Sequence, residues 1–199
     1  MFVLKLKKKS KSKRTPWNKG RKIGWKLPLS LTQIRSVRTR LKAARQRREL
    51  ALFNLAVDSN LKARDIVRLR VCDIARGSHI LSRAAIAQLK SKRAIQFEIN
   101  AETRSSVAAW IAHAGLKSNQ HLFPSRLSES PHLSTRQYAR LVRSWVKSIG
   151  LNPRAYGTQS LQRTRAALIY RRTKSVLAAQ LFVGHTRLRT TARFLGLEL

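Results

Sequence analysis

The first part of the chain has the apolar spacing of two helices. From Ser30 or Thr32 onward, apolar residues recur every three or four positions, and basic residues stand between them. This predicts a helix with one apolar and one basic face, its apolar positions being Ile34, Val37, Leu41 and Ala44. The next run, residues 50–57, is apolar nearly all round, which is typical of a buried central helix. That helix is expected to end near Asp58, Ser59 and Asn60.

The pattern then changes from helical to alternating. A short helical turn is predicted over residues 63–69. Apolar and polar residues alternate over residues 95–99, and residues 84–90 precede them across a turn near Ser91, so the two segments predict an antiparallel hairpin. Residues 71–75 are expected to supply a third strand.

After Asn100 the chain returns to helical spacing. One predicted helix carries Val107, Trp110, Ile111 and Ala114, and another carries Tyr138, Leu141, Val142, Trp145 and Ile149. Two more are predicted from Thr158 to about Thr173 and from about Val176 to Phe182, and a short terminal helix ends near Phe194. Helices, strands and helices again make a mostly α, α+β domain with a small three-stranded antiparallel sheet.

The charge of the chain is extreme. Lys and Arg number 43 against 8 Asp and Glu, a formal net charge of +35, so a polyanion is the expected partner. If the chain neutralises six to ten phosphates, its affinity for the polyanion should fall by roughly 10³–10⁵ when salt is raised from low to moderate concentration. Composition alone leaves an RNA binder or a membrane-surface protein open, but 43% hydrophobic residues argue for a folded domain. No apolar run reaches the length of a membrane span.

The basic residues are densest at the N-terminus. Residues 1–29 predict a basic arm that is disordered without its ligand, followed by one domain over residues 30–199. Trp17 and Trp25 interrupt the arm, either to stack on bases or to dock the arm on the domain. The opening apolar run of residues 1–4 is too short for a signal peptide, so a cytoplasmic protein is expected.

Cysteine and histidine give no metal pattern. The single cysteine, Cys72, excludes an internal disulfide and is interpreted as a small core residue. The five histidines are scattered along the chain, so no metal or other cofactor is expected.

Five local segments resemble, in order, the catalytic domain of the tyrosine recombinases, the phage-type integrases, over roughly residues 31–199. In that family an arginine follows the buried helix, with an acid three residues on; here Lys62 stands at the arginine and Asp65 at the acid. The family's hairpin lysine, a general acid towards the leaving 5′-oxygen, is matched by Lys90. Its His-x-x-Arg motif at the start of a long helix is matched by Gln159 and Gln162.

The last family positions lie at the C-terminal end. His185 in Leu181-Phe182-Val183-Gly184-His185-Thr186 matches the histidine that hydrogen-bonds the scissile phosphate. Nine positions later the family has its nucleophilic tyrosine, and here Phe194 stands there. Of the six positions, Lys90 and His185 match. The resemblance therefore implies the fold and the DNA partner of a recombinase associated with DNA integration, and the replacements imply that the chemistry is lost.

The resemblance also predicts which residues contact DNA and which partners the chain binds, and two alternative functions stay open. Lys90, Arg163, Arg165 and His185 are the expected DNA-contacting residues, with the two arginines directed to DNA backbone or solvent. Duplex DNA is the expected partner, and an active integrase-family relative is a second one. Assembly of copies on DNA stays open, because family members usually continue beyond the tyrosine into a tail that docks on a neighbour. A recombinase with a displaced nucleophile at Tyr170 and a structural nucleic-acid binder are the alternatives.

Overall fold

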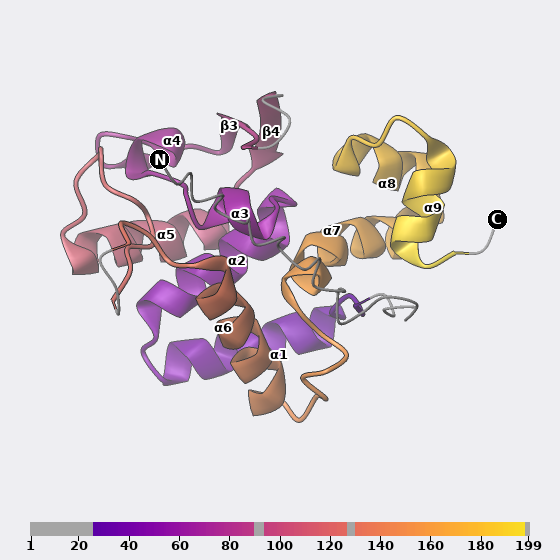
Figure 1. Cartoon of the computed structure of the whole chain (residues 1–199), viewed down its shortest axis with the longest axis horizontal. Helices are drawn as coiled ribbons and strands as arrows, with labels where there is room; N and C mark the ends of the chain where they lie inside the picture. The colour runs from indigo at the N-terminus through magenta and orange to yellow at the C-terminus, as the bar shows by residue number, and fades with distance from the viewer. Residues whose placement is uncertain (1–25, 90–93, 127–129, 198–199) are drawn as a thin grey trace, which may run out of the picture.

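The computed structural model describes residues 26–89, 94–126 and 130–197, and Figure 1 shows a mostly helical domain with small β-hairpins at one side. Most of the predicted arm, with Trp17 and Trp25, lies outside the described residues. So do Lys90 and the predicted turn near Ser91. Residues 26–29 are described and lie against the domain: the backbone N–H of Leu27 donates to the carbonyl of Ala155, and Leu29 is buried.

The two N-terminal helices form as their patterns predict. Helix α1 (Leu31–Ala43) begins at Ser30, whose hydroxyl accepts from the N–H of Gln33 while the Gln33 side chain accepts from the N–H of Ser30. Helix α2 (Arg47–Ser59) is buried at every residue from position 51 to its end and packs against helices on several sides. It ends at Asn60, whose φ of 54° is left-handed.

The strands differ from the predicted three-stranded sheet. After the short helix α3 (Ala63–Ile66), residues 71–74 form helix α4 (Val71–Ile74) rather than a strand. The reason is local, because the carboxylate of Asp73 accepts from the N–H of Arg70 and closes a helical turn. Cys72, on α4, is half-buried.

The described strands pair into two antiparallel ladders. Strand β1 (Ala75–Arg76) pairs with β2 (His79–Ile80), and β3 (Arg83–Ala87) pairs with β4 (Ala94–Glu98), as the predicted hairpin requires. The mostly α fold with a small antiparallel sheet is confirmed. The single three-stranded sheet was wrong, because each ladder has two strands.

The C-terminal helices follow the predicted order. They are α5 (Ala101–Ala114), α6 (Thr135–Ser148), α7 (Thr158–Thr173), α8 (Val176–Val183) and α9 (Leu188–Leu195). Helices α8 and α9 form a hairpin at the end of α7, away from the sheet (Figure 1). Among the described residues, no helix is both long and apolar enough to span a lipid bilayer.

A buried carboxylate ties three of the helices together. Asp58, near the end of α2, is 3% exposed and accepts from the Thr103 hydroxyl at 2.7 Å and the Asn100 N–H at 3.3 Å. Its other oxygen accepts from Nη1 of Arg165, on α7, at 3.2 Å. A buried charge is tolerated when its lone pairs are filled in this way, so Asp58 fixes the start of α5 and the middle of α7 relative to α2.

We expect Asp58→Ala to lower the free energy of unfolding by about 2–4 kcal/mol, since Arg165 and Thr103 would lose a buried partner. Denaturant unfolding measures this directly. The control is Glu98→Ala, which breaks an ion pair to Arg83 whose two side chains are 78% and 62% exposed. It should cost less than about 1 kcal/mol. Equal losses in the two variants would contradict the proposed role of Asp58.

Candidate functional site

The turn between α8 and α9 brings His185 and Phe194 together. Helix α8 ends at Gly184, whose φ of 74° lies in the left-handed region that favours glycine. The chain then reverses, so the ring of His185 meets the ring of Phe194 edge-on at 5.2 Å between centroids. Nδ1 of His185 lies 3.1 Å from the hydroxyl of Thr191, a fully buried residue of α9. The structure therefore brings these two predicted positions together.

Lys62 lies close enough to act on His185. Burial lowers the pKa of the His185 imidazole, and the positive charge of Lys62 lowers it further. The imidazole is therefore neutral at pH 7, with one ring nitrogen able to donate and the other able to accept. Lys62 itself is exposed at the N-cap of α3. The structure thus brings His185 into contact with Phe194 and within electrostatic reach of Lys62.

Arg163 occupies a different environment from the one predicted. Its side chain is buried at 4% exposure instead of facing DNA or solvent. Nε donates to the carbonyl of Phe194 at 2.6 Å and Nη1 to the carbonyl of Lys26, and the guanidinium carbon stands 5.6 Å from the centre of the Phe194 ring. Burial lowers the pKa of Arg163, but arginine remains charged in proteins. Arg163 is a structural clamp on the end of α9.

The two glutamines lie in the first turns of α7. Gln162 is half-buried and makes no side-chain hydrogen bond to the described part of the chain. Gln159 is exposed and borders a cavity of about 580 Å³ at the N-terminus of α7. Three basic residues line the same cavity: Lys26, Arg143 and Arg154. The N-terminus of a helix is the positive end of its dipole, so this cavity is a favourable place for an anion.

Arg165 was expected to face DNA backbone or solvent, and the structure leaves it partly exposed. One nitrogen of the guanidinium binds Asp58, yet the side chain keeps 34% of its surface exposed. It lines a cavity at the base of the β3–β4 hairpin together with Arg83 and Arg104. Arg165 therefore holds α7 in place and still presents a charge to the surface.

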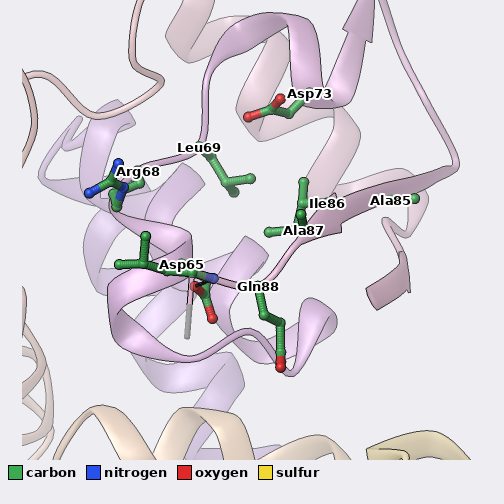
Figure 2. Close-up of a pocket in the computed structure, with 9 residues that line it drawn as sticks. Asp65, Arg68, Leu69, Asp73, Ala85, Ile86, Ala87 and Gln88 are labelled. Atoms are coloured by element: carbon green, nitrogen blue, oxygen red, sulfur yellow. Dashed lines mark hydrogen bonds between the residues drawn. The ribbon is translucent and has the colours of Figure 1, made fainter. Parts of the chain in front are cut away.

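Asp65, which stands at the family's acid position, was not among the predicted site residues. It is 5% exposed, and one carboxylate oxygen accepts from the N–H of Leu89 at 3.0 Å, while the other has no partner among the described residues. Figure 2 shows Asp65 beside Gln88, at one end of a pocket of about 340 Å³ that has Asp73 at its other end. Asp65 thus holds the backbone of Leu89, which follows β3 and immediately precedes Lys90. Lys90 itself lies outside the described residues.

The three tyrosines differ in access. Tyr138 and Tyr156 are buried, at 2% and 8% exposure, and burial raises the pKa of the Tyr138 hydroxyl well above its usual range. Tyr170, on α7, is half-buried. Of the three, Tyr170 alone is accessible enough to be considered as a nucleophile. It lies eight residues beyond Gln162, about 12 Å along the helix axis at 1.5 Å per residue.

Comparison by sequence finds relatives over most of the chain. A family model described as "Phage integrase family" matches residues 29–198. A protein of Bacillus subtilis (strain 168), described as "Probable integrase/recombinase YoeC", is 27% identical over 169 residues, which cover 85% of this chain and 88% of that protein.

Comparison by structure finds the same fold in solved recombinases. The XerA recombinase matches with a TM-score of 0.71 at 16% identity over 86% of this chain, and XerH bound to its difH substrate with 0.65 at 18% over 85%. A lambda integrase dimer bound to a COC′ core site matches with 0.59 at 15% over 87%. The chain spans 61%, 51% and 49% of those three chains. At these identities the likeness establishes the fold.

We expect the stability of the protein to fall as pH drops below neutrality, in part through His185. The pKa of His185 is lower in the folded state, so the unfolded chain binds the proton first. Its stabilising contribution is complete above the unfolded pKa of about 6.5 and is lost as pH falls through the folded pKa. Unfolding free energies of wild type and His185→Asn, measured from about pH 7.5 to 5, should show a shallower loss in the variant. Parallel curves would exclude this role.

Proposed function

Because the chain belongs to the phage integrase family, we propose that it binds duplex DNA at recombination sites without cleaving it. The observation that carries the proposal is the pairing of His185 with Phe194. His185 matches the family histidine that hydrogen-bonds the scissile phosphate, and the aromatic ring beside it has no hydroxyl. The proposed site can therefore receive a phosphate but has no nucleophile at the family position.

The remaining substitutions weaken the same chemistry. In the family, two arginines hold the nonbridging oxygens of the phosphate that is attacked. Lys62 keeps a charge but not the planar two-pronged fork, and Gln162 has no charge. Loss of one preorganised donor typically costs about 10²–10³ in rate. Arg163, next in sequence to Gln162, is held by two backbone carbonyls, so it is poorly placed to replace the missing charge.

Binding of DNA is supported by charge and by the relatives. The basic cavity at the start of α7 lies beside Gln159, so it can receive backbone phosphates next to the proposed site. The XerH structure is described as bound to its difH substrate, the lambda integrase structure as bound to a COC′ core site, and a Tn1549 transposon integrase structure as in complex with transposon right end DNA. A protein that occupies a recombination site in this way would modulate an active relative. Action on DNA also supports the expected cytoplasmic location.

The basic cavity makes a prediction for binding. Arg143→Gln with Arg154→Gln should weaken duplex DNA binding and reduce the slope of log affinity against log salt by about 2, since each phosphate contact contributes about 0.9. Fluorescence anisotropy across salt measures this slope. The matched control is Arg35→Gln with Arg40→Gln, two exposed arginines of α1 that do not line the cavity. If both pairs change the slope equally, the cavity has no special part in binding.

Cleavage is tested with nicked duplexes carrying candidate recombination sites, which trap a covalent protein adduct. We expect retarded DNA and no adduct from wild type or from Phe194→Tyr, because the phosphate clamp is still missing. Adding Lys62→Arg, Gln159→His and Gln162→Arg to Phe194→Tyr should produce an adduct at position 194. Denaturing gels and mass spectrometry detect it.

An adduct from the wild-type chain would overturn the proposal. If mass spectrometry mapped it to Tyr170 and Tyr170→Phe abolished it, the chain would be an active recombinase with a displaced nucleophile. Stronger binding to RNA than to duplex DNA at equal salt would instead indicate a structural nucleic-acid binder.

A further inference from the structure

A second basic cavity lies away from the residues matched to the family's active site. It has a volume of about 350 Å³ and is bordered by the first turn of α2, by α6 and by the segment that precedes α6. Three arginines line it, Arg48, Arg126 and Arg140, together with Gln137, Glu49 and two leucines. Neither His185, Phe194 nor the glutamines of α7 are part of its lining.

Arg48 is the buried member of this cluster. Its side chain is 8% exposed, and Nη2 donates to the carbonyl of Pro124 at 2.5 Å. Nε is buried and has no hydrogen-bond partner among the described residues. A buried, unsatisfied donor on a charged group is costly, so it is found where another group completes its hydrogen bonding. Arg48 lines the cavity, so it is the buried member of the three arginines that border it.

The charge around Arg48 is unbalanced. Among the described residues that line the cavity, Glu49 is one carboxylate against three arginines, and its Oε2 also accepts from Nε1 of Trp145 at 2.5 Å. No ion pair within the described part of the chain involves Arg48, Arg126 or Arg140. The pKa of Arg48 is lowered first by burial and then by the charge of Arg126, although Glu49 partly offsets these effects. The repulsion between these arginines favours an anion in the cavity.

We propose that this cavity is a binding site for a phosphate group, held by Arg48 from within and by Arg126 and Arg140 at the exposed rim. The guanidinium groups offer planar pairs of N–H donors that fit phosphate oxygens, and the amide of Gln137 supplies a neutral donor. The cavity is larger than one phosphate, so the group can belong to a larger molecule. The bound phosphate is either a free small molecule or a phosphodiester of nucleic acid.

The test uses inorganic phosphate as the probe and needs no DNA, so it is independent of the proposed function. Thermal unfolding of the full chain is followed with increasing phosphate against sodium chloride at equal ionic strength. Wild type should be stabilised by phosphate in a saturable way. Arg126→Gln with Arg140→Gln should weaken the apparent phosphate affinity by at least about tenfold, since each charge-assisted bond contributes strongly. Arg48 is left in place because it also binds Pro124.

The control separates a site from general attraction to a basic protein. Arg35→Gln with Arg40→Gln removes the same charge from exposed positions on α1 and should keep the wild-type response. Equal losses in the two double variants, or no stabilisation of wild type beyond that given by chloride, would overturn the proposal.

A second arm identifies the source of the phosphate. A loss of duplex DNA affinity in Arg126→Gln with Arg140→Gln, greater than in the control pair and mimicked by competing phosphate, would assign the site to nucleic acid. Unchanged DNA affinity, with the phosphate response still lost, would assign it to a small phosphorylated ligand.

Discussion

The guanidinium of Arg163 holds together parts of the chain that lie far apart in sequence. From the middle of α7 it reaches the carbonyl of Lys26, before the first helix, and the carbonyl of Phe194, near the end of the last one. The hairpin of α8 and α9 packs mainly on α7 and on itself. Its outer end would therefore be poorly held without this bond. The position of His185 depends in turn on the hairpin, because the imidazole rests on Thr191 and Phe194 of α9.

The charged residues of the molecule fall into two groups, those that are buried and hold the fold together and those that are exposed at the surface. Asp58 and Arg163 are buried, and their hydrogen bonds go to backbone groups and to neighbouring helices. The exposed arginines present their charge to the solvent and to any bound polyanion. In so basic a chain, a charge that is both buried and incompletely paired, as at Arg48, is informative because it cannot be explained by solvent exposure.

Sequence periodicity predicted the helices well and the strands in part. Helix α7 has the predicted bounds, and α2 is buried on all sides as its apolar run indicates. The third strand failed because residues 71–74 are too few to distinguish alternation from one helical turn, and the cap by Asp73 decides between them. The placement of His185 beside Phe194 followed from the family resemblance. The burial of Arg163 could not be predicted in this way. Its partners are backbone carbonyl oxygens, which every residue carries, so no sequence pattern identifies them.

The clamp on Phe194 bears on how such a protein can change over time. Arg163 recognises the backbone of that residue and the face of its ring, and neither depends on a hydroxyl. Exchange of tyrosine for phenylalanine at this position would leave both contacts in place. On the proposed function, the fold and the reaction would rely on different atoms of one side chain, so descent from a cleaving ancestor would be able to remove the reactive oxygen without loss of the contacts that Arg163 makes.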